Sequence, residues 1–356
     1  METRIVQIDS AKIDKNRLKE AAQLIQQGEL VAFPTETVYG LGADALRPEA
    51  SCKIYAAKGR PSDNPLIVHI CKFEELESIA KEVPKQAKLL SDAFWPGPLT
   101  MVVFKNEKVP YETTGGMDTV AVRMPNHPVA LGLIEESGCL IAAPSANTSG
   151  KPSPTEAGHV ALDMDGRIPM ILDGGAVGIG IESTIVDLTE EKPMILRPGY
   201  ITKEMLEEVL GEEVLIDPGI LAADTTDPSM AGQKPKAPGM RYKHYAPKAD
   251  LILVEGETDA VISHINALVK EQQEKGLGVG VIATDETMAR YQADVVMSIG
   301  ARDDEDAIAQ HMYKILRDFD EQQVEVIYSE SFATPRIGQA IMNRLLKAAG
   351  YQVLHV

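Results

Sequence analysis

Apolar residues recur along this chain at two different spacings, and each spacing predicts a different kind of element. Leu18, Ala21, Ala22 and Ile25 lie on one face of a helix, and Gly28 ends that pattern. Short apolar runs bounded by Pro, Gly or polar residues predict buried strands instead. In the first 200 residues such runs fall at 30–33, 66–70, 99–104, 120–123, 140–142, 170–172, 183–187 and 194–197.

Helices are predicted between several of these strands. One begins at Pro48, carries Ile54 and Ala57 inward and ends near Lys58. Another covers residues 202–210 and closes this part of the chain. Some connections between strands are too short to cross over a parallel pair, so the predicted α/β sheet is mixed.

The remaining third of the chain has a simpler order. Residues 211–247 are rich in Pro and Gly without sustained periodicity, which predicts a linker. Beyond it, strands are predicted at 251–254, 279–283, 295–299 and 324–328, and helices at 258–274, 307–319 and 338–349. This alternation predicts a smaller, doubly wound, Rossmann-like α/β domain. The predicted division is therefore 1–210, a linker at 211–247, and 248–356.

Composition narrows the class of protein. The chain has 356 residues, 44% hydrophobic and 25% charged, as in ordinary globular proteins. No apolar run approaches the roughly 20 residues that span a bilayer, and the segment from Met1 to Arg4 lacks the features of a signal peptide. Cys52, Cys71 and Cys139 have no CxxC spacing and lie in apolar contexts, which predicts buried free thiols. We therefore expect a cytoplasmic protein without a membrane partner.

The formal net charge of −18 bears on the kind of ligand. Proteins that hold RNA or DNA over a broad surface are usually basic there. The acidic balance instead favours a small substrate in a local basic pocket.

The strongest candidate for such a pocket is Lys58-Gly59-Arg60-Pro61, which holds two cations between a glycine and a proline, with Asn64 shortly after it. A second polar cluster, 145–150, follows the predicted strand 140–142. Polar groups at strand ends are common ligand contacts in α/β proteins. Together the two segments indicate a phosphate-containing ligand. The alternative is a surface Lys/Arg pair and an ordinary turn.

Other predicted strands also end in polar residues. The segment 34–42 holds two threonines, a carboxylate and two glycines that could bind an amino group and a hydroxyl. Arg123 and Arg197 each end a strand, and Arg123 could bind a carboxylate with both guanidinium nitrogens. A Gly-rich connection, 173–180, leads to Ser183. A polar turn or a surface ion pair explains each of these singly, but their agreement indicates a binding cleft.

Several common motifs are missing. Gly150-Lys151 is followed by Pro152, so there is no Walker loop. Gly276, Gly278 and Gly280 precede a predicted strand, whereas a dinucleotide fingerprint follows one. HExxH, CxxC and GxSxG are absent from the sequence, so a protein-held metal and α/β-hydrolase chemistry are not indicated.

Four motifs taken in order resemble the YrdC/Sua5 family. They are Pro34-Thr35-Glu36-Thr37-Val38-Tyr39-Gly40-Leu41, Lys58-Gly59-Arg60-Pro61, Pro144-Ser145-Ala146-Asn147 and Ser183-Thr184-Ile185-Val186-Asp187. The linker segment 238–247 and the second α/β domain resemble the longer, Sua5-type members. The resemblance implies a YrdC-like mixed twisted sheet with helices in the first domain. It also implies threonylcarbamoyl-AMP synthase activity, in which L-threonine, bicarbonate and ATP give threonylcarbamoyl-adenylate and pyrophosphate.

The same resemblance implies roles for individual residues. Lys58, Arg60 and Asn64 would contact the ATP phosphates, with Lys58 and Arg60 as the catalytic pair. The implied nucleotide site is completed by Thr119, Ser145, Asn147, Ser153, Arg197 and His244. The implied L-threonine site consists of Thr37, His69, Arg123, Ala143 through its backbone, and Ser183. A lone His in an apolar strand is more often a structural core residue, so the sequence leaves the role of His69 open.

The implied chemistry needs no covalent nucleophile, because positioning and charge stabilisation can lower the barrier. Mg²⁺ would arrive with ATP instead of being held by the protein. The product would serve N6-threonylcarbamoylation of adenosine 37 in ANN-decoding tRNAs, completed by separate transfer proteins. Two alternatives remain open from the sequence: an RNA-binding module, and a carbamoyltransferase of the hydrogenase-maturation type.

The linker carries a local charge opposite to that of the chain. Between 233 and 248 there is no acid, whereas Lys234, Lys236, Arg241, Lys243 and Lys248 give +5. We predict that this segment folds over the cleft as a lid, with His244 at the nucleotide. The alternative is a solvated tether.

Overall fold

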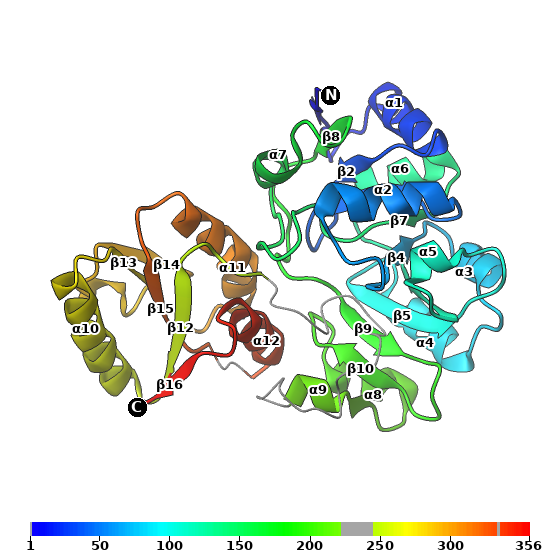
Figure 1. The fold of residues 1–356 in the computed structure, drawn as a ribbon. Helices are drawn as coiled ribbons and strands as arrows, with labels where there is room; N and C mark the ends of the chain where they lie inside the picture. The colour runs from blue at the N-terminus through cyan, green and yellow to red at the C-terminus, as the bar shows by residue number, and fades with distance from the viewer. Residues whose placement is uncertain (1, 222–244, 333–334) are drawn as a thin grey trace. The chain divides into compact units, whose positions relative to one another are not determined.

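The computed structural model describes residues 2–221, 245–332 and 335–356 (Figure 1). By the packing of its Cα atoms the chain divides into two compact units. The first comprises Met1–Ser149, Ser153–Gly178 and Glu182–Arg241, and the second comprises Gly150–Pro152, Ile179–Ile181 and Tyr242–Val356.

The first unit is built on one sheet, which has 11 strands among the described residues. In chain order they are β1 (Arg4–Gln7), β2 (Val31–Phe33), β3 (Gly40–Asp44), β4 (Ile67–His69), β5 (Leu99–Phe104), β6 (Thr119–Arg123), β7 (Ile141–Ala142), β8 (Met170–Asp173), β9 (Thr184–Asp187), β10 (Met194–Arg197) and β11 (Leu215–Ile216). Their order across the sheet is β1-β8-β2-β3-β7-β4-β6-β5-β9-β10-β11. Strand β6 pairs parallel with β4 and antiparallel with β5, so the prediction of a mixed sheet is confirmed.

Helices pack on the sheet and close its core. They are α1 (Lys15–Gln26), α2 (Pro48–Lys58), α3 (Phe73–Ile79), α4 (Lys85–Phe94), α5 (Tyr111–Thr114), α6 (Pro128–Ser137), α7 (Ala157–Met164), α8 (Lys203–Leu210) and α9 (Pro218–Leu221). Helix α2 has the predicted bounds, because Pro48 fits the first turn and Gly59 ends the helix with φ 61°.

Both faces of the sheet are apolar near β2. Val31 and Phe33 pack with residues of α1 and α6, whereas Ala32 points to the other face and joins the larger core. Gly42 in β3 is required for this packing, since a Cβ there would lie 2.6 Å from the Phe33 ring and 2.7 Å from Ile141. The two cores hold the strand ends described below in place.

The second unit is a five-stranded parallel sheet in the order β14-β13-β15-β12-β16. Its elements are β12 (Asp250–Glu255), α10 (Thr258–Glu274), β13 (Val279–Ala283), the 3-10 turn η2 (Met288–Arg290), β14 (Val295–Ser298), α11 (Glu305–Asp320), β15 (Val326–Glu330), α12 (Gly338–Ala348) and β16 (Val353–His355). Helix α10 covers one face of this sheet, and α11 and α12 cover the other (Figure 1). The predicted doubly wound α/β fold is confirmed.

The structure corrects three details. Strands β1, β3 and β16 were not predicted, because none is a plain apolar run. Residues 215–221 at the start of the predicted linker form β11, which pairs with β10, and α9. The three cysteines are free, but Cys52 is exposed and the other two are half-buried, so their predicted burial is wrong.

Candidate functional site

Four polar side chains form a row across adjacent strands of the first unit, which we call the polar row. His69 at the end of β4 is in register with Arg123 at the end of β6, and Arg123 is in register with Thr100 of β5. The Thr100 hydroxyl lies 2.7 Å from that of Ser183, which directly precedes β9. All four side chains are buried. The structure therefore brings together strand ends from distant parts of the sequence.

An apolar row lies beside the polar row on the same face of the sheet. Side chains two residues apart on a strand point to the same face. The positions two residues along from the polar row are Ile67, Ala121, Val102 and Ile185, and they form one buried cluster with Leu196 of β10. The face thus offers a line of polar groups next to a flat apolar strip.

Arg123 is oriented by the protein from two sides. Its Nε donates to the backbone oxygen of Gly97 at 3.3 Å, and its Nη1 donates to the Thr37 hydroxyl at 2.9 Å. Thr37 in turn lies 2.9 Å from the Thr35 hydroxyl, which itself donates to the carbonyl of Val38. The guanidinium plane is therefore fixed, and only Nη2 has no hydrogen bond.

Glu36 faces that remaining nitrogen. Its Oε1 lies 2.7 Å from Nη2 of Arg123, which makes a close ion pair. The N–H bond does not point at the oxygen, however, and neither oxygen of Glu36 accepts a hydrogen bond although both are buried. The Glu36 side chain is 12% exposed and that of Arg123 is 5% exposed. Unsatisfied buried charges of this kind are uncommon in folded proteins and call for an explanation.

A second buried arginine closes the other end of the polar row. Arg197 donates through Nε to the Ser183 carbonyl at 3.0 Å and through Nη2 to its hydroxyl at 3.1 Å. The neighbouring Glu182 accepts a 2.6 Å hydrogen bond from the hydroxyl of Ser153. Three of the predicted site residues, Ser153, Ser183 and Arg197, therefore converge on the start of β9.

The predicted phosphate loop is tied to the polar cluster that follows β7. The Lys58 ammonium donates to the backbone oxygens of Ser145 and Asn147, each at 2.5 Å. The Lys58 carbonyl accepts from the backbone nitrogen of Ser149 at 2.9 Å, and the Ser145 hydroxyl donates to the Asn147 side chain. Lys58 is only 2% exposed, so it is not the surface cation that the alternative interpretation required.

Arg60 and Asn64 form one unit within that loop. Gly59 turns the chain at the end of α2, and Arg60 Nη2 then donates to Asn64 Oδ1 at 2.6 Å and to the Pro65 carbonyl at 3.0 Å. Asn64 is buried, whereas Arg60 is half-buried. Asn64 and Pro65 therefore hold the guanidinium of this half-buried side chain in one orientation.

His69 is a neutral member of the polar row. Burial, and secondly the positive charge of Arg123, lower the pKa of His69 from 6.5 to about 3. Its Nδ1 lies 3.2 Å from the carbonyl oxygen of Ile67. His69 can therefore serve as a hydrogen-bonding group but is too weak a base to accept a proton near neutral pH.

This shift predicts an acid-dependent loss of stability. Between pH 6.5 and pH 3 the unfolded chain binds a proton at His69 that the folded chain does not, so stability falls as the pH falls. The expected contribution by pH 5 is about 2 kcal/mol. We expect the urea midpoint of the wild type to drop further between pH 7.5 and pH 5 than that of His69→Gln. The fluorescence of Trp95, the single Trp of the chain and part of the first unit, reports the transition. Equal drops in both proteins would contradict a buried neutral His69.

The remaining predicted site residues lie in different places. Ala143 follows β7, and its backbone nitrogen donates to Ile67 at 2.8 Å, which places it beside the β4 end of the polar row. Thr119 begins β6, four residues before Arg123, and is not brought into the polar row. His244, and the lid prediction with Arg241 and Lys243, lie outside the described residues.

Four contact residues of this site were not predicted from the sequence. Gly97, Thr100 and Glu182 bond directly to predicted residues, and Glu36 pairs with Arg123. Glu36 lies inside the segment 34–42, which the sequence already indicates as a possible binding segment. Thr100 and Gly97 gave none, because a single Thr in an apolar strand and a Gly in a turn are ordinary.

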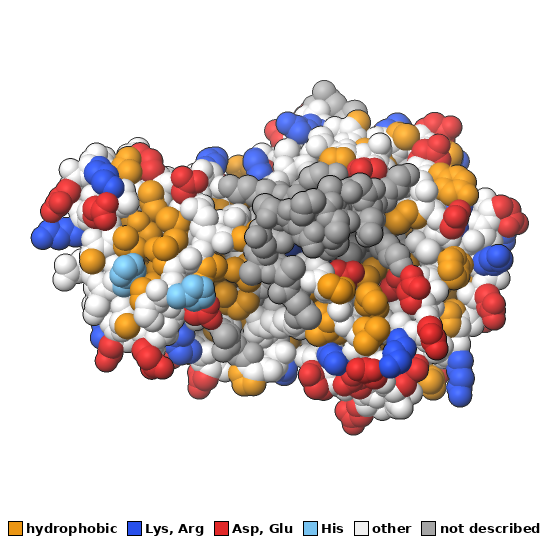
Figure 2. Space-filling model, turned by 60° about the horizontal axis from the view of Figure 1, so that its bottom comes forward, with side chains coloured by type: hydrophobic (Ala, Val, Ile, Leu, Met, Phe, Trp, Pro, Cys, Tyr) orange, Lys and Arg blue, Asp and Glu red, His pale blue; other side chains and the backbone are white. Residues whose placement is uncertain are grey.

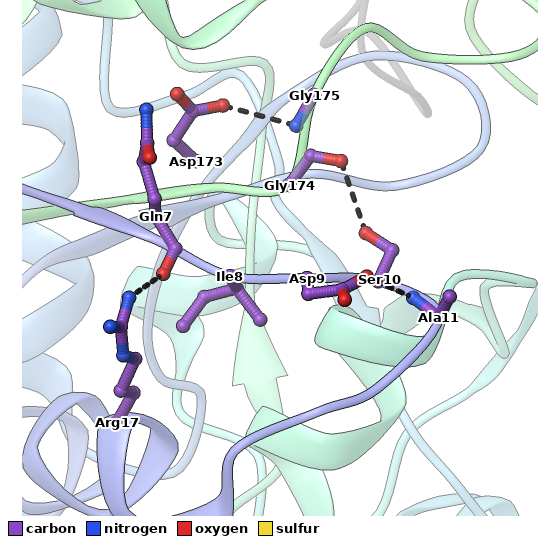
Figure 3. A pocket seen from close by; sticks show the side chains of 9 residues that line it. All are labelled: Gln7, Ile8, Asp9, Ser10, Ala11, Arg17, Asp173, Gly174 and Gly175. Atoms are coloured by element: carbon purple, nitrogen blue, oxygen red, sulfur yellow. Dashed lines mark hydrogen bonds between the residues drawn. The ribbon is translucent and has the colours of Figure 1, made fainter.

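A shallow hollow of about 600 Å³ lies elsewhere in the first unit, at the β1–β8 edge (Figure 3). It is lined by Gln7, Ile8, Asp9, Ser10, Ala11, Arg17, Asp173, Gly174 and Gly175. Its polar groups bond to nearby backbone atoms, as Ser10 does to Gly174 and Arg17 to Gln7. None of the predicted site residues lines it.

Charges on the surface are mixed. On the face drawn in Figure 2, the described Lys and Arg side chains lie among Asp and Glu and form no continuous basic area. Within the described ranges, no helix is both long and apolar enough to cross a membrane. The same ranges hold no group of three His, Cys, Asp or Glu side chains placed to bind a metal.

Two family models together cover most of the chain. Residues 23–199 match the Sua5_yciO_yrdC model, described as telomere recombination. Residues 201–350 match the Sua5_C model, described as the C-terminal domain of threonylcarbamoyl-AMP synthase.

Similar proteins match this chain over nearly its full length. The threonylcarbamoyl-AMP synthase of Pyrococcus abyssi is 50% identical over 97% of this chain and 97% of its own. That of Bacillus subtilis is 49% identical over 97% of this chain and 96% of its own. A crystal structure of P. abyssi Sua5 complexed with L-threonine matches with a TM-score of 0.91 and 49% identity, covering 99% of this chain and 100% of that one.

Proposed function

This chain belongs to the Sua5/YciO/YrdC family, and from that premise we propose that it is a threonylcarbamoyl-AMP synthase. Its substrates would be L-threonine, bicarbonate and ATP, and its products threonylcarbamoyl-adenylate, pyrophosphate and water. The observation that carries the proposal is the buried polar row with its fixed arginine. Such a row suits the binding of an amino acid together with the carboxyl group that is activated.

The polar row is the proposed threonine site. Gly97 and Thr37 hold Nε and Nη1 of Arg123, and a substrate carboxylate would complete the hydrogen bonding of Nη2. Neutral His69 and the hydroxyl of Ser183 would contact the rest of the amino acid. The backbone of Ala143 would border it at the end nearest β4.

The segments joined by Lys58 are the proposed triphosphate site. Lys58 and Arg60 come from the end of α2, and Ser145 and Asn147 come from the cluster that Lys58 holds. Asn64 orients Arg60. At the start of β9, Arg197 and Ser153 would contact the nucleotide. Thr119 is assigned to this site only through the family resemblance.

The proposed reaction has two steps. The neutral amine of threonine attacks the carbon of bicarbonate and forms a carbamate with loss of water. A carbamate oxygen then attacks the α-phosphorus of ATP, and pyrophosphate leaves. The protein would supply orientation and positive charge, which is sufficient for phosphoryl-type transfer without a covalent intermediate. Mg²⁺ would enter as part of the nucleotide substrate.

We further propose that the product serves N6-threonylcarbamoylation of adenosine 37 in ANN-decoding tRNAs. A reactive mixed anhydride must be passed to separate transfer proteins, so the reaction would take place in the cytoplasm where those proteins and the tRNAs meet. In this scheme the enzyme itself needs no broad contact with nucleic acid, which fits the net charge of −18.

Pyrophosphate release tests the proposal directly. With Mg²⁺ and ATP, we expect release only when L-threonine and bicarbonate are both present, because the attacking oxygen belongs to the carbamate. Mass spectrometry should then detect threonylcarbamoyl-adenylate. Valine lacks the hydroxyl and should be a much poorer substrate, since it leaves polar groups of the site unpaired. Equal pyrophosphate release without threonine would sink the assignment.

A further inference from the structure

Glu36 forms an ion pair with Arg123 of the polar row, but neither residue completes its hydrogen bonding in this contact. Both carboxylate oxygens are buried and accept no hydrogen bond, and the nearest cation, Nη2 of Arg123, also lacks one. Burying a charge without hydrogen bonds is costly, so such a pair is expected where a ligand completes it. The cost is partly offset by the 2.7 Å ion pair between the two residues.

The spacing of these two charges matches the head group of an amino acid. An α-ammonium and an α-carboxylate are bonded to the same carbon, so a protein that binds both must present an acceptor and a cation side by side. Glu36 and Arg123 do so, with 2.7 Å between their nearest atoms. Gly97 and Thr37 hold Nε and Nη1 of the arginine, which leaves Nη2 beside Glu36.

We propose that Glu36 is a catalytic residue that binds the α-ammonium of threonine and takes a proton from it. This inference rests on the proposed function, in which the amine must be neutral before it can form a carbamate. Glu36 suits this role better than His69, because a carboxylate attracts the ammonium before it takes the proton, whereas His69 is neutral and its Nδ1 faces the carbonyl of Ile67. Among the described residues of the polar row and its contacts, Glu36 is the carboxylate next to the arginine.

The proton transfer balances with the rest of the reaction. One N–H bond of the ammonium breaks, its electron pair stays on nitrogen, and an O–H bond forms on Glu36. The nitrogen pair then forms a bond to the carbon of bicarbonate. The C–OH bond breaks, and the hydroxide leaves as water with a second amine proton. The products are the carbamate, water and a protonated Glu36, which later returns its proton to solvent.

Arg123 of β6 and His127 are the charged and titratable neighbours of Glu36. His127, at the start of α6, has its pKa lowered by burial, which outweighs the opposing effect of Glu36, so it stays neutral above pH 7. A change in rate between pH 7 and pH 9 can therefore be attributed to the amine and its base.

The test compares Glu36→Gln with wild type at saturating ATP and bicarbonate. Gln is similar in shape but cannot accept the proton, and loss of a general base typically lowers the rate about 10²–10⁴-fold. We expect such a loss in kcat/KM for threonine at pH 7. The deficit should then shrink about tenfold for each pH unit toward the pKa of the free amino group, because solution supplies the neutral amine. Glu77→Gln, on the exposed face of α3, is the matched control and should behave as wild type.

Binding gives a second readout. Calorimetry with 2,3-dihydroxybutyrate, which has a hydroxyl in place of the amino group, should show wild type favouring threonine strongly and Glu36→Gln favouring it little. A Glu36→Gln enzyme with near wild-type kcat/KM, or with a deficit equal at pH 7 and pH 9, overturns the role of Glu36 alone. A wild-type enzyme that does not require threonine overturns the proposed function, and this inference with it.

Discussion

Replacing Lys58 by Ala is expected to lower kcat/KM for ATP by about 10²–10³-fold, as the loss of one charged transition-state contact does in other enzymes. The ammonium of Lys58 lies where the end of α2 meets the segment after β7, bonded to the carbonyls of Ser145 and Asn147. The substitution removes that charge from the proposed triphosphate site. It also removes the hydrogen bonds that Lys58 donates to two carbonyls, which should lower the stability of the first unit by about 1–3 kcal/mol.

Lys53→Ala is the matched control for this experiment. Lys53 lies on the same helix, but its side chain is 43% exposed and pairs with Glu29 at 2.7 Å. A surface pair of this kind contributes about 0–1 kcal/mol, so activity should not change. Trp95 fluorescence confirms that each variant is folded before ATP kinetics are measured. If Lys58→Ala is folded and keeps its kcat/KM, Lys58 is a structural residue that does not act on phosphate.

The sequence predicted the architecture well wherever the signal was local. Helix α2, strand β5 and helix α10 have their predicted bounds, because each is marked by a Pro, Gly or apolar run. Strand β3 was missed because its GLGAD sequence lacks the β-branched residues typical of strands. It forms because Gly42 allows Phe33 and Ile141 to pack against the backbone, which depends on residues distant in the sequence.

The sequence predicted the site as a set of polar strand ends, but it did not predict the contacts between the site residues. Polar groups at the ends of β2, β6, β7 and β10 pointed to a cleft, and the structure gathers most of them. His69 lies next to Arg123, and Arg123 next to Thr100, because of the strand order in the sheet. In that order, neighbouring strands often come from distant parts of the chain. No spacing in the sequence reveals that Lys58 bonds to the backbone of Ser145, because the partner is a carbonyl that every residue carries.

Replacing Arg123 by Gln is expected to weaken L-threonine binding by about 10²–10³-fold. Removing one member of a buried charge pair costs about 2–5 kcal/mol, because the other member stays buried and unpaired. Here both Glu36 and the substrate carboxylate would lose their cation. Arg123→Lys should recover only part of the loss, since one ammonium cannot reach Gly97, Thr37 and the ligand together. Calorimetry at fixed pH measures the threonine affinity, and ATP affinity should change little.

L-threoninol, in which an alcohol replaces the carboxylate, separates recognition from general damage. Wild type should bind threoninol about as weakly as Arg123→Gln binds threonine. The variant should not distinguish the two compounds, because the group that reads the carboxylate is gone. Arg47→Gln provides the control, since the Arg47 side chain is 51% exposed and its ion-pair partner is Asp44, which lies outside the polar row. If Arg123→Gln still prefers threonine to threoninol as strongly as wild type does, the carboxylate binds elsewhere and Arg123 serves only to hold Thr37 and Glu36.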